Sequence, residues 1–250
     1  MAPLEGQYLL IIGGSSGMGF SAAKLALAGG AKVAIASSSA DKVQHAVSRL
    51  GGDSGHNQVS GHVVDLAGPD PEAALENLLN EATQGGQHPL DHIINTEGRG
   101  QPKPISEIDL TSAHDLARLP LFVPLLLGKL APRSLKPGPN SSLIFTSGQV
   151  AEKPIPGYGA LAAFVAAQHG LARNLAVDLA PLRVNVVAPG PTETKMWGAR
   201  RGAIREMVVG RSLLGKAGAP DEVAEAYVYL VRNTDATGSI VSSNGGVTLK

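Results

Sequence analysis

The stretch Ile12-Gly13-Gly14-Ser15-Ser16-Gly17-Met18-Gly19 decides the fold of this chain. It follows an aliphatic run at residues 8–12 and precedes a segment with helical periodicity, so it predicts a tight turn from a strand into a helix. Glycines in such a turn let the backbone bend sharply and approach a pyrophosphate held at the helix N-terminus. A glycine-rich turn alone is weak evidence, but a place between strand and helix in a βαβ unit is the context that dinucleotide binding requires.

Beyond this turn, short aliphatic runs alternate with longer helical patterns along the whole chain. This alternation indicates a parallel sheet covered by helices on both faces. We therefore expect an α/β fold, doubly wound, with a seven-stranded parallel sheet in a three-layer α/β/α arrangement and a single domain over residues 1–250. The predicted strands are residues 8–12, 32–36, 61–65, 92–95, 142–146, 184–188 and 240–243.

Helix ends are marked by characteristic pairs of residues. Asp70-Pro71 predicts an N-cap and first turn for a helix over residues 70–84, and Pro220 opens the last long helix in the same way. Gly29-Gly30 is expected to close the first helix, because glycine takes the left-handed cap conformation at little cost.

The helix predicted over residues 158–179 carries small residues on nearly every face. A helix that is apolar all round is expected to be buried all round, with one side on the sheet and the other against a second subunit. This interpretation predicts a homo-oligomer, either a dimer or a tetramer. The alternative is that alanine is abundant there because it is the best helix former.

Composition excludes several classes of protein. The 250 residues balance 21 Lys and Arg against 21 Asp and Glu without a basic stripe, so no nucleic-acid partner is expected. The absence of cysteine excludes disulfides and thiolate chemistry. The N-terminus lacks a signal-peptide pattern and no apolar run can span a bilayer, so we expect a cytoplasmic protein without a membrane partner. The seven histidines lack metal-ligand spacing, so no metal site is expected, and His169 is assigned to an interface or the surface.

The chain resembles the short-chain dehydrogenase/reductase family over nearly its whole length. The family's TGxxxGxG motif is matched at Gly13, Gly17 and Gly19, with Ile12 where threonine is usual. Four further motifs of the family follow in order and at plausible spacing: Asp65-Leu66, Asn95-Thr96-Glu97-Gly98, Pro189-Gly190 and Asn244-Gly245-Gly246. The resemblance implies a Rossmann-type fold that binds a nicotinamide dinucleotide.

The same resemblance implies which residues hold the cofactor. Asp65-Leu66 is expected at the adenine, and Thr194 at the nicotinamide carboxamide. The full expected set comes from the loops that follow the strands: Gly13, Ser15, Ser16, Gly17, Met18, Gly19, Ser37, Ser38, Ser39, Asp65, Leu66, Asn95, Thr96, Gly98, Pro189, Gly190, Thr192 and Thr194.

The choice between the two coenzymes depends on the end of the second strand. A carboxylate there would accept hydrogen bonds from the ribose and repel a 2′-phosphate, but the chain has Ser37-Ser38-Ser39. The basic residues that the family tends to place at positions 16 and 38 are also missing, although Lys42 and the serine hydroxyls could bind the phosphate. NADP(H) is therefore preferred, with NAD(H) possible.

The catalytic residues match the family only in part. The resemblance assigns the serine that orients the substrate oxygen to Ser147 and the proton-handling tyrosine to Tyr158. The lysine that lowers the pKa of this tyrosine is replaced by Ala162, and the asparagine of the proton relay by Ala117. Two of four roles are thus vacant.

The missing lysine affects the two directions of reaction unequally. Oxidation needs a tyrosinate, and a tyrosine with a pKa of ~10 is almost wholly protonated at neutral pH. Reduction needs only the phenol. We therefore expect an NADPH-dependent reductase of a small apolar carbonyl, enone or imine, in secondary metabolism, with a substrate lid at about residues 191–215 that contains Trp197. The alternatives are a non-redox cyclase or isomerase derived from a reductase, and a cofactor-binding protein without catalysis.

Overall fold

The computed structural model describes residues 2–52, 58–98 and 102–250. Within them, seven parallel strands form one sheet in the order β3-β2-β1-β4-β5-β6-β7. The strands are β1 (Tyr8–Ile12), β2 (Lys32–Ser37), β3 (Val59–Val63), β4 (His92–Asn95), β5 (Ser142–Thr146), β6 (Arg183–Pro189) and β7 (Ile240–Ser243). This sheet confirms the predicted doubly wound, Rossmann-type α/β fold.

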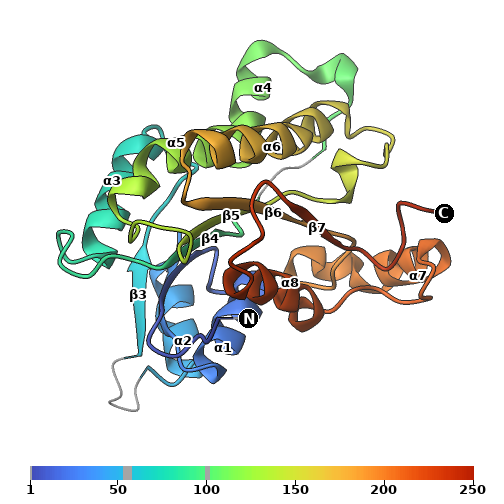
Figure 1. Ribbon diagram of the computed structural model, residues 1–250. Coiled ribbons are helices and arrows are strands. Elements are labelled where there is room, and N and C mark those ends of the chain that lie inside the picture. The colour runs from blue at the N-terminus through green and yellow to red at the C-terminus, as the bar shows by residue number, and fades with distance from the viewer. Residues whose placement is uncertain (1, 53–57, 99–101) are drawn as a thin grey trace.

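Helices cover both faces of the sheet and complete three layers (Figure 1). One face carries α3 (Pro71–Ala82), α4 (Leu110–Ala117), α5 (Val123–Leu130) and α6 (Gly159–Asp178). The other carries α1 (Gly17–Ala28), α2 (Ala40–Arg49) and α8 (Pro220–Arg232). The remaining helix, α7 (Arg201–Arg211), lies beyond these layers near the C-terminus and buries only Val208.

The central strands are continuously apolar because both of their faces are covered. In β1, Leu10 and Ile12 belong to the hydrophobic cluster under α3, α5 and α6, while Leu9 and Ile11 belong to the cluster under α1 and α8. A strand buried on both faces has no polar side to alternate with, which explains why the run reads as uniformly aliphatic.

The sequence locates most element ends and misplaces a few. The strands β1, β4, β5 and β7 have the predicted bounds, and Gly30 takes the left-handed conformation (φ 87°) expected at the end of α1. The third strand begins two residues earlier than predicted, because its pairing with β2 starts at Val33 and Val59. Consequently Asp65 lies after the strand and not within it. The helix α3 ends at Ala82, two residues before the predicted end.

Within the single chain, α6 is covered on one side only. Only Gln168 and Ala172 are fully buried on this helix, and Val177 is 76% exposed. The sheet and α4 and α5 cover one side, and the other side is open. Cover by a second subunit stays a prediction.

The sheet reverses its winding between β1 and β4, since β2 and β3 extend to one side and β5 to β7 to the other. In open α/β sheets, ligands bind outside the carboxyl ends of the strands at such a reversal. None of the helices in the described ranges is long and apolar enough to cross a membrane.

Candidate cofactor and catalytic site

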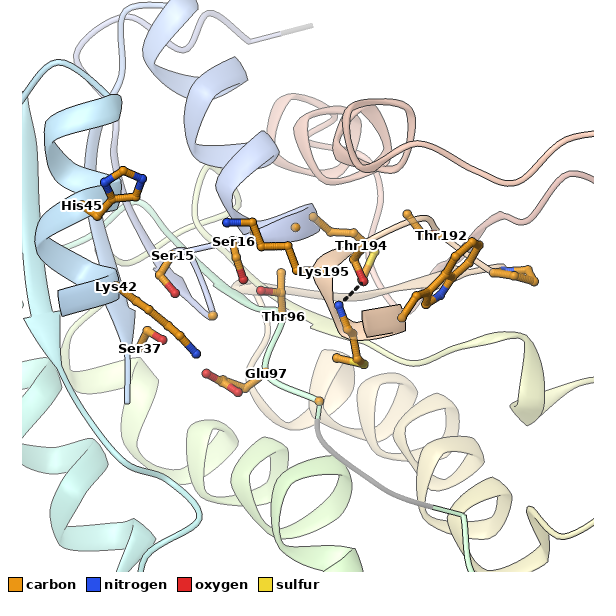
Figure 2. Close-up of a pocket in the computed structure, with 18 of the residues that line it drawn as sticks. Ser15, Ser16, Ser37, Lys42, His45, Thr96, Glu97, Thr192, Thr194 and Lys195 are labelled. Carbon is orange, nitrogen blue, oxygen red and sulfur yellow. Dashed lines mark hydrogen bonds between the residues drawn. The ribbon is translucent and has the colours of Figure 1, made fainter. Parts of the chain in front are cut away.

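A cavity of about 580 Å³ opens at the carboxyl edge of the sheet. Its lining comes from the loops after β1, β2, β4 and β6, and consists of Gly13, Ser15, Ser16, Gly17, Met18, Gly19, Ser37, Lys42, His45, Arg49, Thr96, Glu97, Gly98, Gly190, Pro191, Thr192, Thr194, Lys195, Met196 and Trp197. Figure 2 shows Ser37, Lys42 and His45 at one end of this cavity and Thr192 at the other. The structure thus brings together most residues of the expected cofactor site.

The floor of the cavity is a backbone cradle that has no room for side chains. A Cβ on Gly13 would lie 2.5 Å from Thr96 Oγ1, and a Cβ on Gly19 would lie 2.5 Å from both Gly13 O and Thr96 Oγ1. The Thr96 hydroxyl fixes this approach by donating a hydrogen bond to Ile12 O at 2.9 Å. Gly13 also needs its positive φ of 82°, which glycine adopts readily.

The helix α1 begins at Gly17 directly behind this cradle. Its first turn contains no acidic residue, and the Ser16 side chain makes no capping hydrogen bond. The backbone N–H groups of a helix N-terminus carry partial positive charge and suit a phosphate. The residues present therefore fit the pyrophosphate of a dinucleotide.

Basic residues on α2 surround the end of the cavity next to β2. Lys42, His45 and Arg49 lie at helical spacing on one face of α2 and line the cavity together with Ser37. Lys42 was expected from the sequence, but His45 and Arg49 were missed. They lie three and seven residues after Lys42, a spacing that places all three on one face of a helix. The one acidic residue among the described residues of the lining is Glu97, from the loop after β4, and Figure 2 draws its carboxylate on the side of Lys42 and Ser37.

Some expected cofactor residues lie outside the cavity lining. Ser38 and Ser39 lie beyond it, and the Ser39 hydroxyl caps α2 by accepting from Lys42 N at 3.4 Å. Leu66 is buried in the hydrophobic core, and the exposed Asp65 accepts a hydrogen bond from Ala67 N.

Asn95 and Pro189 also lie outside the lining, at the ends of β4 and β6. Asn95 is buried, and its Oδ1 accepts from Glu97 N at 3.2 Å. It thereby supports the loop that carries Thr96 and Gly98 into the cavity.

The far end of the cavity is built from the segment after β6. Thr192 donates to Gly190 O at 3.0 Å, and Thr194 accepts from Met196 N at 3.3 Å, which caps the short 3₁₀ helix Lys195–Arg200. Met196 and Trp197 add apolar surface there. The region predicted as a substrate lid therefore supplies one wall of the cavity.

The two predicted catalytic residues come from different parts of the fold. Ser147 directly follows β5 and its Oγ lies 2.9 Å from Nε2 of His169. Tyr158 is the N-cap of α6, eleven residues and about 16 Å of helix before His169. Neither Ser147 nor Tyr158 lines the cavity, and the Tyr158 hydroxyl has no hydrogen-bond partner within the described residues. Their catalytic roles stay predictions.

His169 is the residue at this site that the sequence analysis misplaced. It is half-buried and bonded to Ser147, not free on the surface. Burial lowers its pKa, Glu152 opposes this by raising the pKa, and Arg173 lowers it further. At neutral pH the imidazole is therefore mostly neutral, able to accept a hydrogen bond from the serine hydroxyl.

The strand end that carries Ser147 is held rigidly. The Thr146 hydroxyl donates to Asn95 O at 2.7 Å and meets the Tyr227 hydroxyl at 2.8 Å. Burial strongly raises the pKa of Tyr227, so this phenol stays neutral. Its hydroxyl reaches the end of β5 from α8. The end of β5 is thereby locked to β4.

The two positions that the family resemblance left vacant lie on α6 and α4. Ala162 lies in the first turn of α6, and Ala117 is a buried residue at the end of α4. A π-helical segment, Arg118–Phe122, follows Ala117, and the Arg118 side chain is engaged by Ala67 O and Asp115. Within the described residues, no group of three or more metal-ligating side chains is arranged to hold a metal ion.

Comparison with known proteins identifies the class of this protein. The model of the SDR-like Rossmann domain matches residues 3–250. The chain therefore belongs to the short-chain dehydrogenase/reductase family, which confirms the resemblance inferred from the motifs. It is an oxidoreductase-type fold that binds a nicotinamide dinucleotide.

Three relatives show how far the likeness extends. The short-chain dehydrogenase/reductase ATR9 of Stachybotrys chlorohalonatus is 42% identical over 253 residues, which covers 100% of both chains. The structure of the MalC reductase/Diels-Alderase from Malbranchea aurantiaca has a TM-score of 0.90 at 32% identity, over 99% of this chain and 98% of that one. The cis-4-hydroxycyclohexanecarboxylate dehydrogenase of Sinomonas cyclohexanicum is 30% identical over 96% of this chain and 95% of its own.

Proposed function

We propose that this protein is an NADPH-dependent reductase of a small apolar carbonyl, enone or imine in secondary metabolism. The observation that carries the proposal is the cavity itself. It combines a glycine cradle for the pyrophosphate with three basic side chains at the end of β2 and an apolar wall at the opposite end. A bound nicotinamide in reduced form would supply a hydride at that apolar end.

The preference for NADPH over NADH rests on charge. Lys42, His45 and Arg49 converge on the end of the cavity next to Ser37, where the adenosine ribose is expected. Arg and Lys side chains bind phosphate through charge-assisted hydrogen bonds, whereas a ribose hydroxyl gains little from them. The end of β2 carries Ser37 in place of the carboxylate that would repel a 2′-phosphate, which favours the same coenzyme.

The preference for reduction rests on proton supply. The position where the family has its lysine is Ala162, so alcohol oxidation lacks the group that would help a tyrosine to act as a base, whereas reduction needs only the phenol as an acid. Met196 and Trp197, in the segment proposed as a lid over residues 191–215, favour an apolar substrate and help to exclude water from the reaction.

Titration of the purified protein with NADPH, NADP⁺ and NADH, followed by single-turnover absorbance at the nicotinamide band, tests this function. The probes are cyclohexanone, cyclohexenone and methylpyrroline. We expect NADPH to bind more tightly than NADH, and at least one probe to consume it. Failure of both coenzymes to bind contradicts the proposal. Turnover that is unchanged in Tyr158→Phe removes the acid role assigned to that residue.

A second function is a non-redox cyclase or isomerase. Two observations favour it: the incomplete catalytic set at Ala162 and Ala117, and the likeness to MalC, which is described as both a reductase and a Diels-Alderase. In that case NADPH would bind tightly without being consumed while an unsaturated probe changes its structure. Product analysis by mass spectrometry separates the two, because reduction adds two hydrogens and isomerisation adds none.

A further inference from the structure

We propose that His169 is the positioning residue of a proton relay in which Ser147 exchanges a proton with the substrate and His169 supplies or removes it. The proposal rests on the reductase function above, but it assigns the proton transfer to Ser147 in place of Tyr158, with His169 from the middle of α6 behind it. Three features support it: the position of Ser147, its contact with His169 and the charges around His169.

Ser147 lies between the two loops that form the reactive end of the cavity. Its backbone N–H donates to Val187 O at 2.9 Å, which places it beside β6 just before the turn at Gly190. Continuing the register of β4 with β5 places it on the other side next to Glu97. Both Gly190 and Glu97 line the cavity, so Ser147 lies between two lining loops although it is not itself part of the lining.

The contact between Ser147 and His169 has the geometry of a proton-transfer pair. The 2.9 Å separation of Oγ and Nε2 is within hydrogen-bond distance, and the two residues come from different elements, β5 and α6. The rigid end of β5, held through Thr146 to Asn95 and Tyr227, fixes the serine against this imidazole. A side chain held from two directions keeps the orientation that proton transfer requires.

Two charges act on His169 among the described residues: Glu152, just after the turn Gln149–Ala151, and Arg173, one helical turn further along α6. Half-burial lowers the pKa of His169, so that its imidazolium is a stronger acid than an exposed histidine. The remaining exposure of the ring lets it exchange protons with solvent. Such a group can pass protons to and from Ser147 repeatedly.

The proposed step balances for reduction. The substrate carbon gains a hydride, and the electron pair of its double bond moves to the oxygen or nitrogen. That atom takes the Ser147 Oγ proton, while Oγ takes the Nε2 proton from the His169 imidazolium. The imidazole is left neutral and regains a proton from water. In the reverse direction neutral His169 removes the proton from Ser147 as Ser147 takes one from the alcohol.

Substitution separates a relay from a purely structural contact. We expect His169→Gln and Ser147→Ala each to slow single-turnover reduction of cyclohexanone, cyclohexenone or methylpyrroline about 10- to 100-fold. The KM and the NADPH Kd should change less than about twofold, and the double variant should lose little more than either single one, as in a shared unit. His88→Gln is the matched control, because His88 is exposed on a loop away from the cavity.

The pH dependence of the reaction rates in the two directions tests the relay. Reduction uses the protonated imidazole, so its rate should rise as the pH falls through the pKa of His169, and this rise should vanish in His169→Gln. Oxidation of cyclohexanol would use the neutral form, so its rate should show the opposite pH dependence and fall as the pH falls through the pKa of His169. A tyrosine acting alone would instead require pH near 10.

A measurement without cofactor tests the pair directly. Nitrogen NMR of the cofactor-free protein should show Nε2 of His169 as a hydrogen-bond acceptor, and Ser147→Ala should shift that resonance. An unchanged resonance overturns the pairing.

The kinetic outcomes distinguish the two proposals. Full-rate reduction by His169→Gln overturns the relay and leaves the reductase function standing. A wild-type protein that binds NADPH but reduces none of the three probes overturns the reductase function and the relay with it.

Discussion

The two edges of the sheet use polar side chains in opposite ways. At the amino edge, Arg183 is 2% exposed and donates to the carbonyl oxygens of Pro139, Leu230, Val231, Asn233 and Ala236. His92 at the same edge is fully buried between Ser142 and Gln7. At the carboxyl edge, serines, threonines and lysines line a cavity instead.

The difference teaches where this protein keeps its free binding capacity. Buried polar groups that are fully paired stabilise one structure and leave nothing for a ligand. Groups around a cavity keep their hydrogen-bonding capacity for a substrate. Substitutions at the amino edge should therefore change stability without changing coenzyme binding, whereas substitutions at the carboxyl edge should weaken coenzyme binding.

The largest expected effect is at Arg183. Arg183→Ala leaves several carbonyl oxygens without a donor inside the protein, so we expect the free energy of unfolding to fall by about 3 to 5 kcal/mol. Chemical denaturation measures this change. Arg133→Ala is the control, since Arg133 is exposed and should shift stability by less than about 0.5 kcal/mol. If the folded Arg183→Ala variant bound NADPH more weakly than the wild type, the contrast between the two edges of the sheet would be wrong.

Gly19→Ala tests the carboxyl edge. The new Cβ would overlap Gly13 O and Thr96 Oγ1, so the cradle must shift. We expect NADPH affinity to fall at least about tenfold, and the free energy of unfolding to fall by about 2 kcal/mol. Calorimetric titration and denaturation measure the two changes. Gly202→Ala on α7 meets no atom within 4 Å and should leave both quantities nearly unchanged.

The pH dependence of stability sharpens the comparison at His92. Burial, with help from Arg183 and Lys136, lowers the pKa of His92 to about 3 from its ordinary 6.5. The unfolded state then binds a proton below pH 6.5 that the folded state excludes, so stability falls as the pH falls. From pH 7 to pH 5 this group should remove about 2 kcal/mol. Denaturation at both pH values measures it, and a wild-type slope in His92→Asn would contradict the assignment.

The smallest expected effect is at the basic face of α2. Removing the charge in Lys42→Ala or Arg49→Ala should raise the NADPH Kd about five- to tenfold and leave the NADH Kd nearly unchanged, because only NADPH carries the 2′-phosphate. Gln44→Ala on the same helix lies outside the cavity lining and serves as the control. An equal loss of affinity for NADPH and NADH would show that these side chains do not bind the 2′-phosphate.

Much of the cofactor site could be predicted because it is built from local sequence. The cradle from Gly13 to Gly19 lies within one turn, and its glycines are required by contacts that a single loop and its neighbour make. The loops with Thr96 and Gly190 follow aliphatic strands that periodicity locates well. His45 and Arg49 were missed because their relation to the site depends on the orientation of α2.

The catalytic end could not be predicted in the same way. Ser147 and His169 are separated by 22 residues and meet only because β5 and α6 pack together. The family resemblance assigned Tyr158 its catalytic role beside Ser147, and that role stays a prediction. The fold in addition sets Ser147 against His169 in the middle of α6. The small residues on the outer face of α6 indicate close packing but do not identify the partner.

By itself, the sequence determined a parallel α/β sheet, a glycine turn for a dinucleotide and the family to which the chain belongs, because these features depend on short-range backbone geometry and on the period of apolar residues. Only the tertiary structure decided which polar side chains are fully paired inside the protein and which remain around the cavity. It also decided that Ser147 contacts His169, because such contacts depend on how distant elements pack, and that packing is fixed by the whole core.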